Sequence, residues 1–321
     1  MVNSILHVKD LKIYFPLVSK FFSRVKGYVK AVDGITLEIK KGETLGLVGE
    51  SGSGKSTLGK GIVCLYSPYS GEILYKGANL GDRSAKELRQ IRKNLQMVFQ
   101  DPYSSLNPRM TVASMLGEGM KIHGLCTKGE IKGRVNDLLQ MVGLPRDAGT
   151  RYPHEFSGGQ RQRLSIARAL SIDPEFIVLD EPVSALDVSM QAQILNLLKD
   201  LQGRLGLTYL FIAHDLSVVK HMSSRVAVMN LGRLVEVLRD EEIEERARHP
   251  YTVSLISSIP KLDEEEKGKK IILEGDIPSP INLPEGCRFQ TRCYQATEQC
   301  RRIDPELKDL GEDHQVACLL C

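Results

Sequence analysis

The stretch "TLGLVGESGSGKSTLGKGIVCL", residues 44–65, decides the fold of this chain. A mostly apolar run comes first, "GESGSGKST" at Gly49–Thr57 follows, and a helical pattern completes the stretch. The middle part fits the phosphate-loop pattern of a glycine, four residues and then Gly-Lys-Ser/Thr. In such a loop, backbone N–H groups at a helix N-terminus bind a polyphosphate, which only small residues allow to approach so closely. The stretch therefore predicts a strand, a phosphate loop and a helix.

Two side chains of this loop are expected to carry chemistry. Lys55 would reach the β- and γ-phosphates of a nucleotide, and the Ser56 hydroxyl would ligate Mg²⁺. A glycine-rich turn that binds nothing is the alternative, and it is disfavoured because the motif lies between a strand and a helix. The predicted nucleotide-binding residues of the loop are Gly49, Glu50, Ser51, Gly52, Ser53, Gly54, Lys55, Ser56 and Thr57.

A second buried strand is predicted in "DPEFIVLDEP", residues 173–182. It would end with Asp180, placed to hold the Mg²⁺ shell, followed by Glu181, placed to orient and activate the attacking water. The alternative is that the two acids merely mark an exposed strand end and have no role in catalysis or metal binding. Beside a phosphate loop that alternative is weak, so the two motifs together predict Mg²⁺-dependent hydrolysis of ATP.

The other elements alternate between short apolar runs and helical patterns, which is typical of a mostly parallel sheet. "GLTYLFIAHD" at 206–215 predicts one more strand, and "RVAVMNLGRLVEV" at 225–237 predicts two strands joined by a turn at Asn230 and Gly232. Residues of about 102–170 are richer in helical patterns. We therefore expect an inserted helical subdomain there.

After about residue 240 the character of the sequence changes. An acidic segment is followed by a proline-marked helix in "HPYTVSLISSIP" and by the charged linker "KLDEEEKGKK". The predicted fold class is thus α/β, with a phosphate-loop ATPase core that has a mixed sheet, and with a small cysteine-rich extension. The expected domains are residues 1–240 and 241–321.

Charge and hydropathy exclude several classes of protein. The 321 residues carry 43 basic and 40 acidic side chains, a net charge of +3 that gives no reason to expect nucleic acid as a partner. No run of 18 apolar residues occurs, and "MVNSILHVKD" lacks the apolar core and cleavage site of a secretory signal. We therefore expect a cytosolic chain.

Five of the seven cysteines lie in the last 35 residues. Cytosolic thiols stay reduced, so such a cluster favours metal ligation over disulfides. Four thiolates suit iron–sulfur or zinc, and the spacing lacks the C-x₂-C pairs common in zinc modules. Simple surface thiols are disfavoured because they would be open to oxidation.

A third motif, "EFSGGQRQRLSIARAL", occupies residues 155–170. Its Ser157, Gly158, Gly159 and Gln160 open a helix and form a second N-terminus that is able to grip a phosphate. One nucleotide site does not need a second phosphate-binding helix N-terminus. A second copy of the chain, or a close relative, would explain it.

Together these motifs resemble the nucleotide-binding subunits of ABC transporters, over nearly all of residues 5–240. The order of the motifs is the family's. They are the phosphate loop, Gln100 in "VFQDP", the signature "FSGGQ", Asp180 with Glu181, Asp187 in "SALD" and His214 in "IAHD". The signature departs from the family only in Phe156, where leucine is usual.

The resemblance implies a head-to-tail dimer that sandwiches two ATP molecules, each between one subunit's phosphate loop and the other's signature. Gln100 would then sense the γ-phosphate and Mg²⁺ and link to the membrane partner. His214 would contact the γ-phosphate, and Asp187 would lie at the dimer interface. The adenine would stack on an aromatic ring, for which Tyr14 and Phe15 are the candidates, with Tyr28 as an alternative.

Two segments, "QDPYSSLNPRMTV" at 100–112 and "RHPYTVSLISSIP" at 248–260, resemble the peptide and nickel importer branch and, within it, the second ATPase of a pair. This implies a sister ATPase as partner, with a homodimer left open, beneath two transmembrane permease subunits at the cytoplasmic face of the cell membrane. An extracytoplasmic substrate-binding protein would be an indirect partner.

The tail resembles the C-terminal extension of the same branch, through "IPSPINLPEGCRFQTRC" and "HQVAC". In relatives this extension carries a 4Fe-4S cluster. The resemblance implies such a cluster here, with Zn²⁺ as the alternative metal. The ligands would be Cys287, Cys293, Cys300 and Cys318.

The function implied is that of an ATP-hydrolysing importer motor, for di- or oligopeptides or else for oligosaccharides or nickel. A soluble ABC ATPase acting on nucleic acid or ribosomes is a second hypothesis, which the single cassette in this chain disfavours. A redox-sensing iron–sulfur ATPase is a third.

Overall fold

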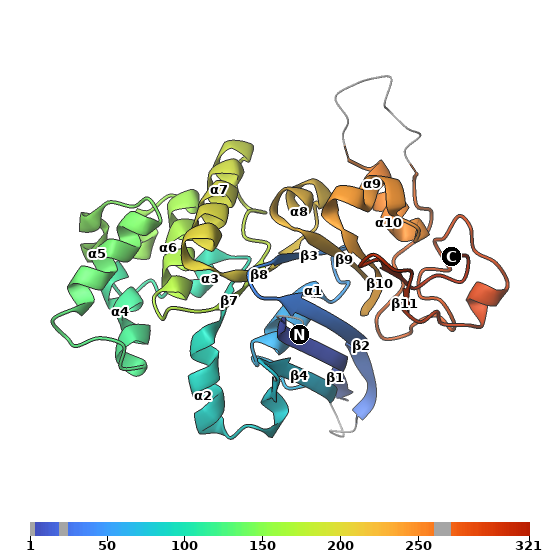
Figure 1. The fold of residues 1–321 in the computed structure, drawn as a ribbon, viewed down its shortest axis with the longest axis horizontal. Helices are drawn as coiled ribbons and strands as arrows, with labels where there is room; N and C mark the ends of the chain where they lie inside the picture. Colours follow the sequence, from blue (N-terminus) through green and yellow to red (C-terminus); the bar gives the residue numbers. More distant parts are fainter. Residues whose placement is uncertain (1–3, 19–24, 260–270) are drawn as a thin grey trace. The chain divides into compact units, whose positions relative to one another are not determined.

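The computed structural model describes residues 4–18, 25–259 and 271–321. The chain forms two compact units, which are described here one at a time (Figure 1). The first unit contains Met1–Ile39, Thr44–Gly81 and Ala213–Cys321, and the second contains Lys40–Glu43 and Asp82–Ile212. Within the described ranges, no helix is both long enough and apolar enough to span a membrane.

The first unit contains a four-stranded sheet in the order β2-β1-β4-β5. Its strands are β1 (Ser4–Val18), β2 (Val25–Lys40), β4 (Ser70–Tyr75) and β5 (Ala78–Asn79). β1 pairs antiparallel with β4, and a bulge between Lys9 and Lys12 shifts the register. This sheet was not predicted, because two consecutive exposed residues at the bulge, Lys9 and Asp10, break the apolar alternation of β1.

Five strands of the larger sheet also belong to the first unit, in the order β11-β12-β10-β9-β3. They are β3 (Thr44–Val48), β9 (Arg225–Asn230), β10 (Arg233–Arg239), β11 (Lys308–Asp309) and β12 (Gln315–Val316). β3 and β9 run parallel, and β10 returns antiparallel to β9. The strands predicted in residues 44–65 and 225–237 are thereby confirmed.

The helices of the first unit are short. They are α1 (Lys55–Ile62), α8 (Leu216–Met222), α9 (Ile243–Arg246) and α10 (Pro250–Ser257). α8 packs closely on β3, since a Cβ atom at Gly46 would lie 2.2 Å from Cγ1 of Val219. α10 confirms the proline-marked helix that the sequence predicts.

The second unit contains three parallel strands. They are β6 (Leu95–Val98), β7 (Phe176–Asp180) and β8 (Thr208–Ala213). β7 pairs with both neighbours and all five of its residues are buried, as its continuous apolar sequence predicts. Parallel and antiparallel pairs thus occur together, which confirms the mixed sheet.

Helices make up the rest of the second unit. They are α2 (Ala85–Asn94), α3 (Pro102–Ser105), α4 (Val112–Ile122), α5 (Ile131–Met141), α6 (Gly158–Leu170) and α7 (Val188–Leu205). Between residues 102 and 170 the elements described are α3 to α6 and two 3₁₀ turns, Arg146–Thr150 and Pro153–Glu155. This agrees with the helical content expected there. A separate subdomain at these residues stays a prediction, because they belong to the same compact unit as β6, β7 and β8.

The C-terminal extension, residues 271–321, belongs to the first unit and has little regular structure (Figure 1). Besides β11 and β12 it contains one 3₁₀ turn, Gln299–Arg301. β12 pairs antiparallel with β10, and the fully buried Glu236 of β10 meets Nε2 of His314 at 2.8 Å. The same carboxylate accepts the backbone N–H of Arg248 at 2.8 Å. The bond from His314 attaches the extension to the sheet that carries β3.

Candidate ATP-binding site

The phosphate loop joins the end of β3 to the start of α1. Gly49 and Gly54 adopt positive φ angles of 155° and 105°. A Cβ atom would lie 2.1 Å from the carbonyl oxygen of Met229 at Gly49, and 2.0 Å from that of Ala31 at Gly54. Both positions therefore require glycine, and the loop has the close backbone packing that the motif predicts.

Lys55 is the first residue of α1, directly after Gly54 of this loop. Its side chain is buried, with 4% exposed, and Nζ donates to the carbonyl oxygens of Gly49 at 2.7 Å and Glu50 at 2.9 Å. The N-cap of α1 is Gly54, which has no side chain that could cap the N–H groups of the first turn. Those groups and the ammonium are what a bound triphosphate requires.

The two candidate adenine platforms lie on neighbouring positions of β1, and therefore on opposite faces of the strand. Tyr14 stacks on Tyr69 with ring centroids 4.7 Å apart, and Tyr28 lies 6.2 Å from Tyr14. Phe15 instead meets Tyr66 edge-on at 5.2 Å. The structure thus places Tyr14 and Tyr28 in one aromatic cluster and Phe15 in another.

The Tyr14 hydroxyl donates a hydrogen bond to Asp33. Asp33 also pairs with the guanidinium of Arg288, which comes from the C-terminal extension. Burial alone would raise the pKa of Asp33, but the hydrogen bonds from Tyr14 and Arg288 outweigh burial and hold this pKa below its usual value. Asp33 is therefore charged at neutral pH, and it holds Tyr14 in place.

In the second unit, the structure brings Gln100 and Glu181 together. Asp180 ends β7 with 3% of its surface exposed, and Glu181 follows with a left-handed φ of 46°. Nε2 of Gln100 donates to the Glu181 carboxylate at 2.7 Å, and the Glu181 N–H donates to the carbonyl of Ile212 at 2.9 Å. Non-glycine residues with positive φ concentrate at functional sites, so this geometry agrees with a catalytic role for Glu181.

The signature forms the N-terminus of α6 as expected. Ser157 is the N-cap, its Oγ accepts the N–H of Gln160 at 3.4 Å, and Oε1 of Gln160 accepts the N–H of Ser157 at 3.0 Å. Phe156, at the position where the family usually has leucine, is buried and carries the Arg151 guanidinium over its ring at 4.4 Å. The departure from the family is thus accommodated by packing.

Asp187 caps α7 beside the signature. Its Oδ1 accepts the N–H of Met190 at 2.9 Å. The Met190 side chain lies over Gly159, where a Cβ atom would come within 2.1 Å of the methionine methyl. The helix that Asp187 caps therefore packs directly on the signature. His214 belongs to the first unit, where it is exposed directly after β8.

The four predicted metal-ligand cysteines lie together in the extension. Burial, with Cys300, Cys293 and Cys318 nearby, raises the pKa of Cys287 to about 11. The Cys287 N–H donates to the carbonyl of Cys300 at 2.8 Å. Among the residues that the structure describes, however, no three or more His, Cys, Asp or Glu side chains are arranged to hold a metal ion.

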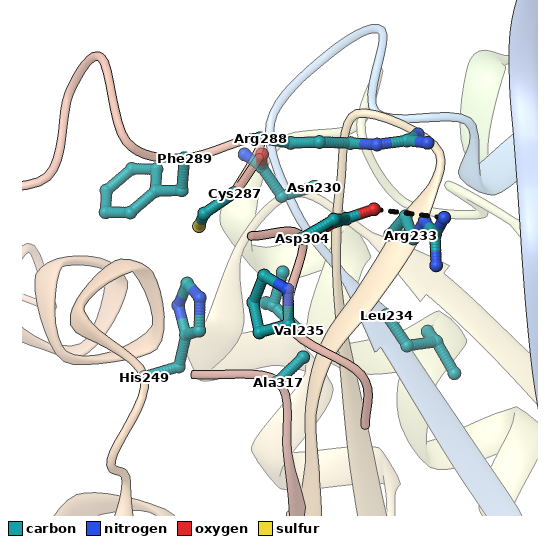
Figure 2. Close-up of a pocket in the computed structure, with 11 residues that line it drawn as sticks. Asn230, Arg233, Leu234, Val235, His249, Cys287, Arg288, Phe289, Asp304 and Ala317 are labelled. Atoms are coloured by element: carbon teal, nitrogen blue, oxygen red, sulfur yellow. Dashed lines mark ion pairs between the residues drawn. The ribbon is translucent and has the colours of Figure 1, made fainter. Parts of the chain in front are cut away.

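A small pocket lies between the extension and the turn from β9 to β10 (Figure 2). Figure 2 shows Cys287, Phe289 and His249 on one side of it and Arg233, which pairs with Asp304 at 3.0 Å, on the other. The cavity measures about 20 Å³, which is room for about one water molecule. It is therefore too small for a nucleotide.

Comparison with known proteins identifies the family. A family model described as "ABC transporter" matches residues 32–184, and one described as "Oligopeptide/dipeptide transporter, C-terminal region" matches residues 235–300. Over 321 residues the chain is 52% identical to the oligopeptide transport ATP-binding protein AppF of Bacillus subtilis (strain 168), covering 99% of the chain and 98% of the relative. The chain belongs to the ABC transporter ATP-binding subunits.

Another relative of this ABC ATPase is the dipeptide transport ATP-binding protein DppF of Haemophilus influenzae, 47% identical over 98% of the chain and 96% of the relative. A solved ATP-binding cassette, dimeric in a post-hydrolysis state with ADP and Pi, is similar with a TM-score of 0.65 and 29% identity, over 73% of this chain and 98% of that one. The resemblance inferred from the motifs is confirmed. The matched C-terminal region ends at residue 300, before Cys318.

Sequence reasoning missed the residues of the extension that contact the nucleotide site. Arg288 holds Asp33, and Arg292 pairs with Glu50 of the phosphate loop. The only local signal is that each arginine is next to a cysteine, and that does not indicate a partner more than 200 residues away.

Proposed function

We propose that this ABC ATPase is the motor subunit of a membrane importer for di- and oligopeptides. The observation that carries the proposal is the 52% identity to an oligopeptide transport ATP-binding protein along the whole chain, including the C-terminal region. The test is peptide uptake by cells that lack this chain. Lost uptake of peptides, restored by the gene, supports the proposal, whereas lost uptake of only nickel or oligosaccharides overturns the choice of cargo.

The proposed cycle assigns a role to each motif. ATP and Mg²⁺ bind at the phosphate loop with Lys55 and Ser56, while Asp180 holds the Mg²⁺ shell. Glu181 activates the attacking water, Gln100 senses the γ-phosphate and His214 contacts it. The hydrogen bond between Gln100 and Glu181 supports this assignment because it couples the sensor to the base.

Dimer closure is proposed to complete each site with the partner's signature. The signature supplies a capped helix N-terminus, and the similar solved cassette is a dimer. The partner is proposed to be a sister ATPase, beneath two permease subunits at the cytoplasmic face of the membrane, served by an extracytoplasmic substrate-binding protein. Copurification with membrane subunits supports this arrangement, whereas copurification with ribosomes or DNA would favour a soluble ATPase.

Adenine is proposed to stack in the aromatic cluster that contains Tyr14. We expect Tyr14→Ala to raise the Kd for ATP by about 5- to 150-fold, because base–aromatic stacking contributes about 1–3 kcal/mol. Phe15→Ala, on the opposite face of β1, is the matched control and should change this Kd less than about twofold. Equal losses in the two variants would contradict the assignment of Tyr14.

Cys287, Cys293, Cys300 and Cys318 are proposed to hold a 4Fe-4S cluster. The donor set fits, since the four thiols come from distant positions and lie close together: beside burial, Cys300 and Cys318 contribute to the raised pKa of both Cys287 and Cys293. Bound there, the cluster would stabilise the C-terminal extension, which has too small a hydrophobic core to fold alone.

The cluster is tested by metal analysis of protein purified without oxygen. We expect about four irons and four sulfides per chain and a broad visible absorption, both lost in Cys293→Ser. Cys126→Ser, in the second unit, is the control that should retain them. One zinc without iron would identify the alternative metal. A strong change in ATPase rate on reduction of an intact cluster would favour a redox-sensing role.

A further inference from the structure

Every polar group of Glu50, the second residue of the phosphate loop, is held. Its N–H donates to the hydroxyl of Tyr251 at 2.8 Å, and its carbonyl accepts from Nζ of Lys55 at 2.9 Å. Its carboxylate accepts both terminal nitrogens of the Arg292 guanidinium, at 2.6 and 2.9 Å. This two-pronged geometry is the strongest that an arginine and a carboxylate form.

The contact is partly buried. The Arg292 side chain is 9% exposed and that of Glu50 27%. Tyr251 is fully buried, and its ring packs against Phe289 at 5.2 Å. A partly buried ion pair of this kind is screened less by salt than an exposed pair.

Both anchors come from the far end of the chain. Tyr251 lies on α10, and Arg292 lies between Cys287 and Cys293 in the extension. Arg292, five residues after Cys287, thus reaches Glu50. Arg288, the residue that follows Cys287, donates to the carbonyl of Leu231. The neighbouring Gly232 N–H in turn donates to the carbonyl of Ser53, in the loop itself, at 2.8 Å.

Glu50 has an electrostatic consequence for the site. An unpaired carboxylate in the phosphate loop would repel the triphosphate, and the repulsion between like charges is strong where little water screens it. Arg292 cancels that charge, while Tyr251 and Lys55 hold the backbone of Glu50. Removing Arg292 would therefore weaken ATP binding by leaving the Glu50 charge unpaired.

We propose that Arg292 is a positioning residue for ATP, which makes the cysteine-rich extension a structural part of the nucleotide site in the same chain. The proposal rests on the nucleotide site assigned above to the phosphate loop. It adds that the extension sets ATP affinity through Glu50, with no contact to the nucleotide.

The test compares KM for ATP and kcat in the full chain. Arg292→Ala is expected to raise KM about tenfold, as for the loss of a charge-assisted hydrogen bond, with kcat within about twofold of the parent. Arg292→Met keeps the aliphatic stem and serves if the alanine variant is unstable. The matched control is Arg302→Ala, whose partner Glu298 lies 3.1 Å away on the exposed surface of the extension, and it should change neither constant.

A second variant separates positioning from simple packing. In Glu50→Gln/Arg292→Ala the unpaired charge is gone, so KM should return to within about threefold of the parent. A KM unchanged in Arg292→Ala, or a double variant no better than Arg292→Ala, overturns the inference. Lys55→Ala tests the nucleotide site on which the proposal rests. If it binds ATP normally, the nucleotide site itself is wrong, whereas loss of binding there with an unaffected Arg292→Ala overturns only the role of Arg292.

Discussion

Glu181→Gln is expected to lower ATP turnover by about 100- to 10,000-fold, the usual contribution of a general base, while ATP binding stays within about threefold. Gln is isosteric with Glu, and its carbonyl oxygen can still accept the hydrogen bond from Gln100. The left-handed φ of residue 181 also tolerates Gln as well as it tolerates Glu. The variant therefore removes the proton acceptor and keeps the geometry.

The measurement is phosphate release by the assembled importer, together with equilibrium binding of ATP to the purified chain. Glu118→Gln, an exposed carboxylate on α4, is the matched control and should leave both unchanged. Undiminished turnover in Glu181→Gln would mean that another residue activates the water. Lost ATP binding would instead show that Glu181 supports the fold of the site.

The second large effect is expected at the signature, where two substitutions separate helix capping from phosphate binding. Asp and Asn both replace Ser as an N-cap, and Asp also interacts favourably with the helix dipole. Ser157→Asp and Ser157→Asn should therefore leave the thermal midpoint within a few degrees of the parent. Asp, however, places a negative charge where the partner's γ-phosphate is proposed to bind, and Asn does not.

We expect Ser157→Asp to lower the ATPase rate of the assembled importer by about 100-fold, the scale of losing a group that stabilises transition-state charge. Ser157→Asn should retain a third or more of the parent rate. ATP binding to the isolated chain should be unchanged in both, because this signature completes the partner's site. If Ser157→Asp weakened binding to its own chain, a signature acting in trans would be refuted.

Several elements follow from local sequence alone. The glycine motif predicts the phosphate loop together with the strand before it and the helix after it. This works because backbone conformation and N–H exposure depend on neighbouring residues. The same holds for the Ser157 cap, and for the turn between β9 and β10 at Gly232. For these segments the expected and observed elements coincide.

Other elements could not be predicted in this way. The sheet of β1, β2, β4 and β5 was not predicted because two consecutive exposed residues at the bulge in β1, Lys9 and Asp10, break its apolar alternation. The role of the extension escaped for another reason. A run with almost no regular structure has no periodicity to recognise, and its position depends on bonds such as that between Glu236 and His314.

The sequence by itself therefore determined the chemistry of this protein: a nucleotide-binding loop, an acidic pair, a signature and a group of four cysteines. Only the tertiary structure decided which of these groups meet. It placed Gln100 on Glu181, 81 residues apart, and Arg292 on Glu50, 242 residues apart. Motifs are local because they reflect the backbone geometry and reactivity of adjacent residues. Contacts at such separations depend on how strands and loops pack, which no local pattern encodes.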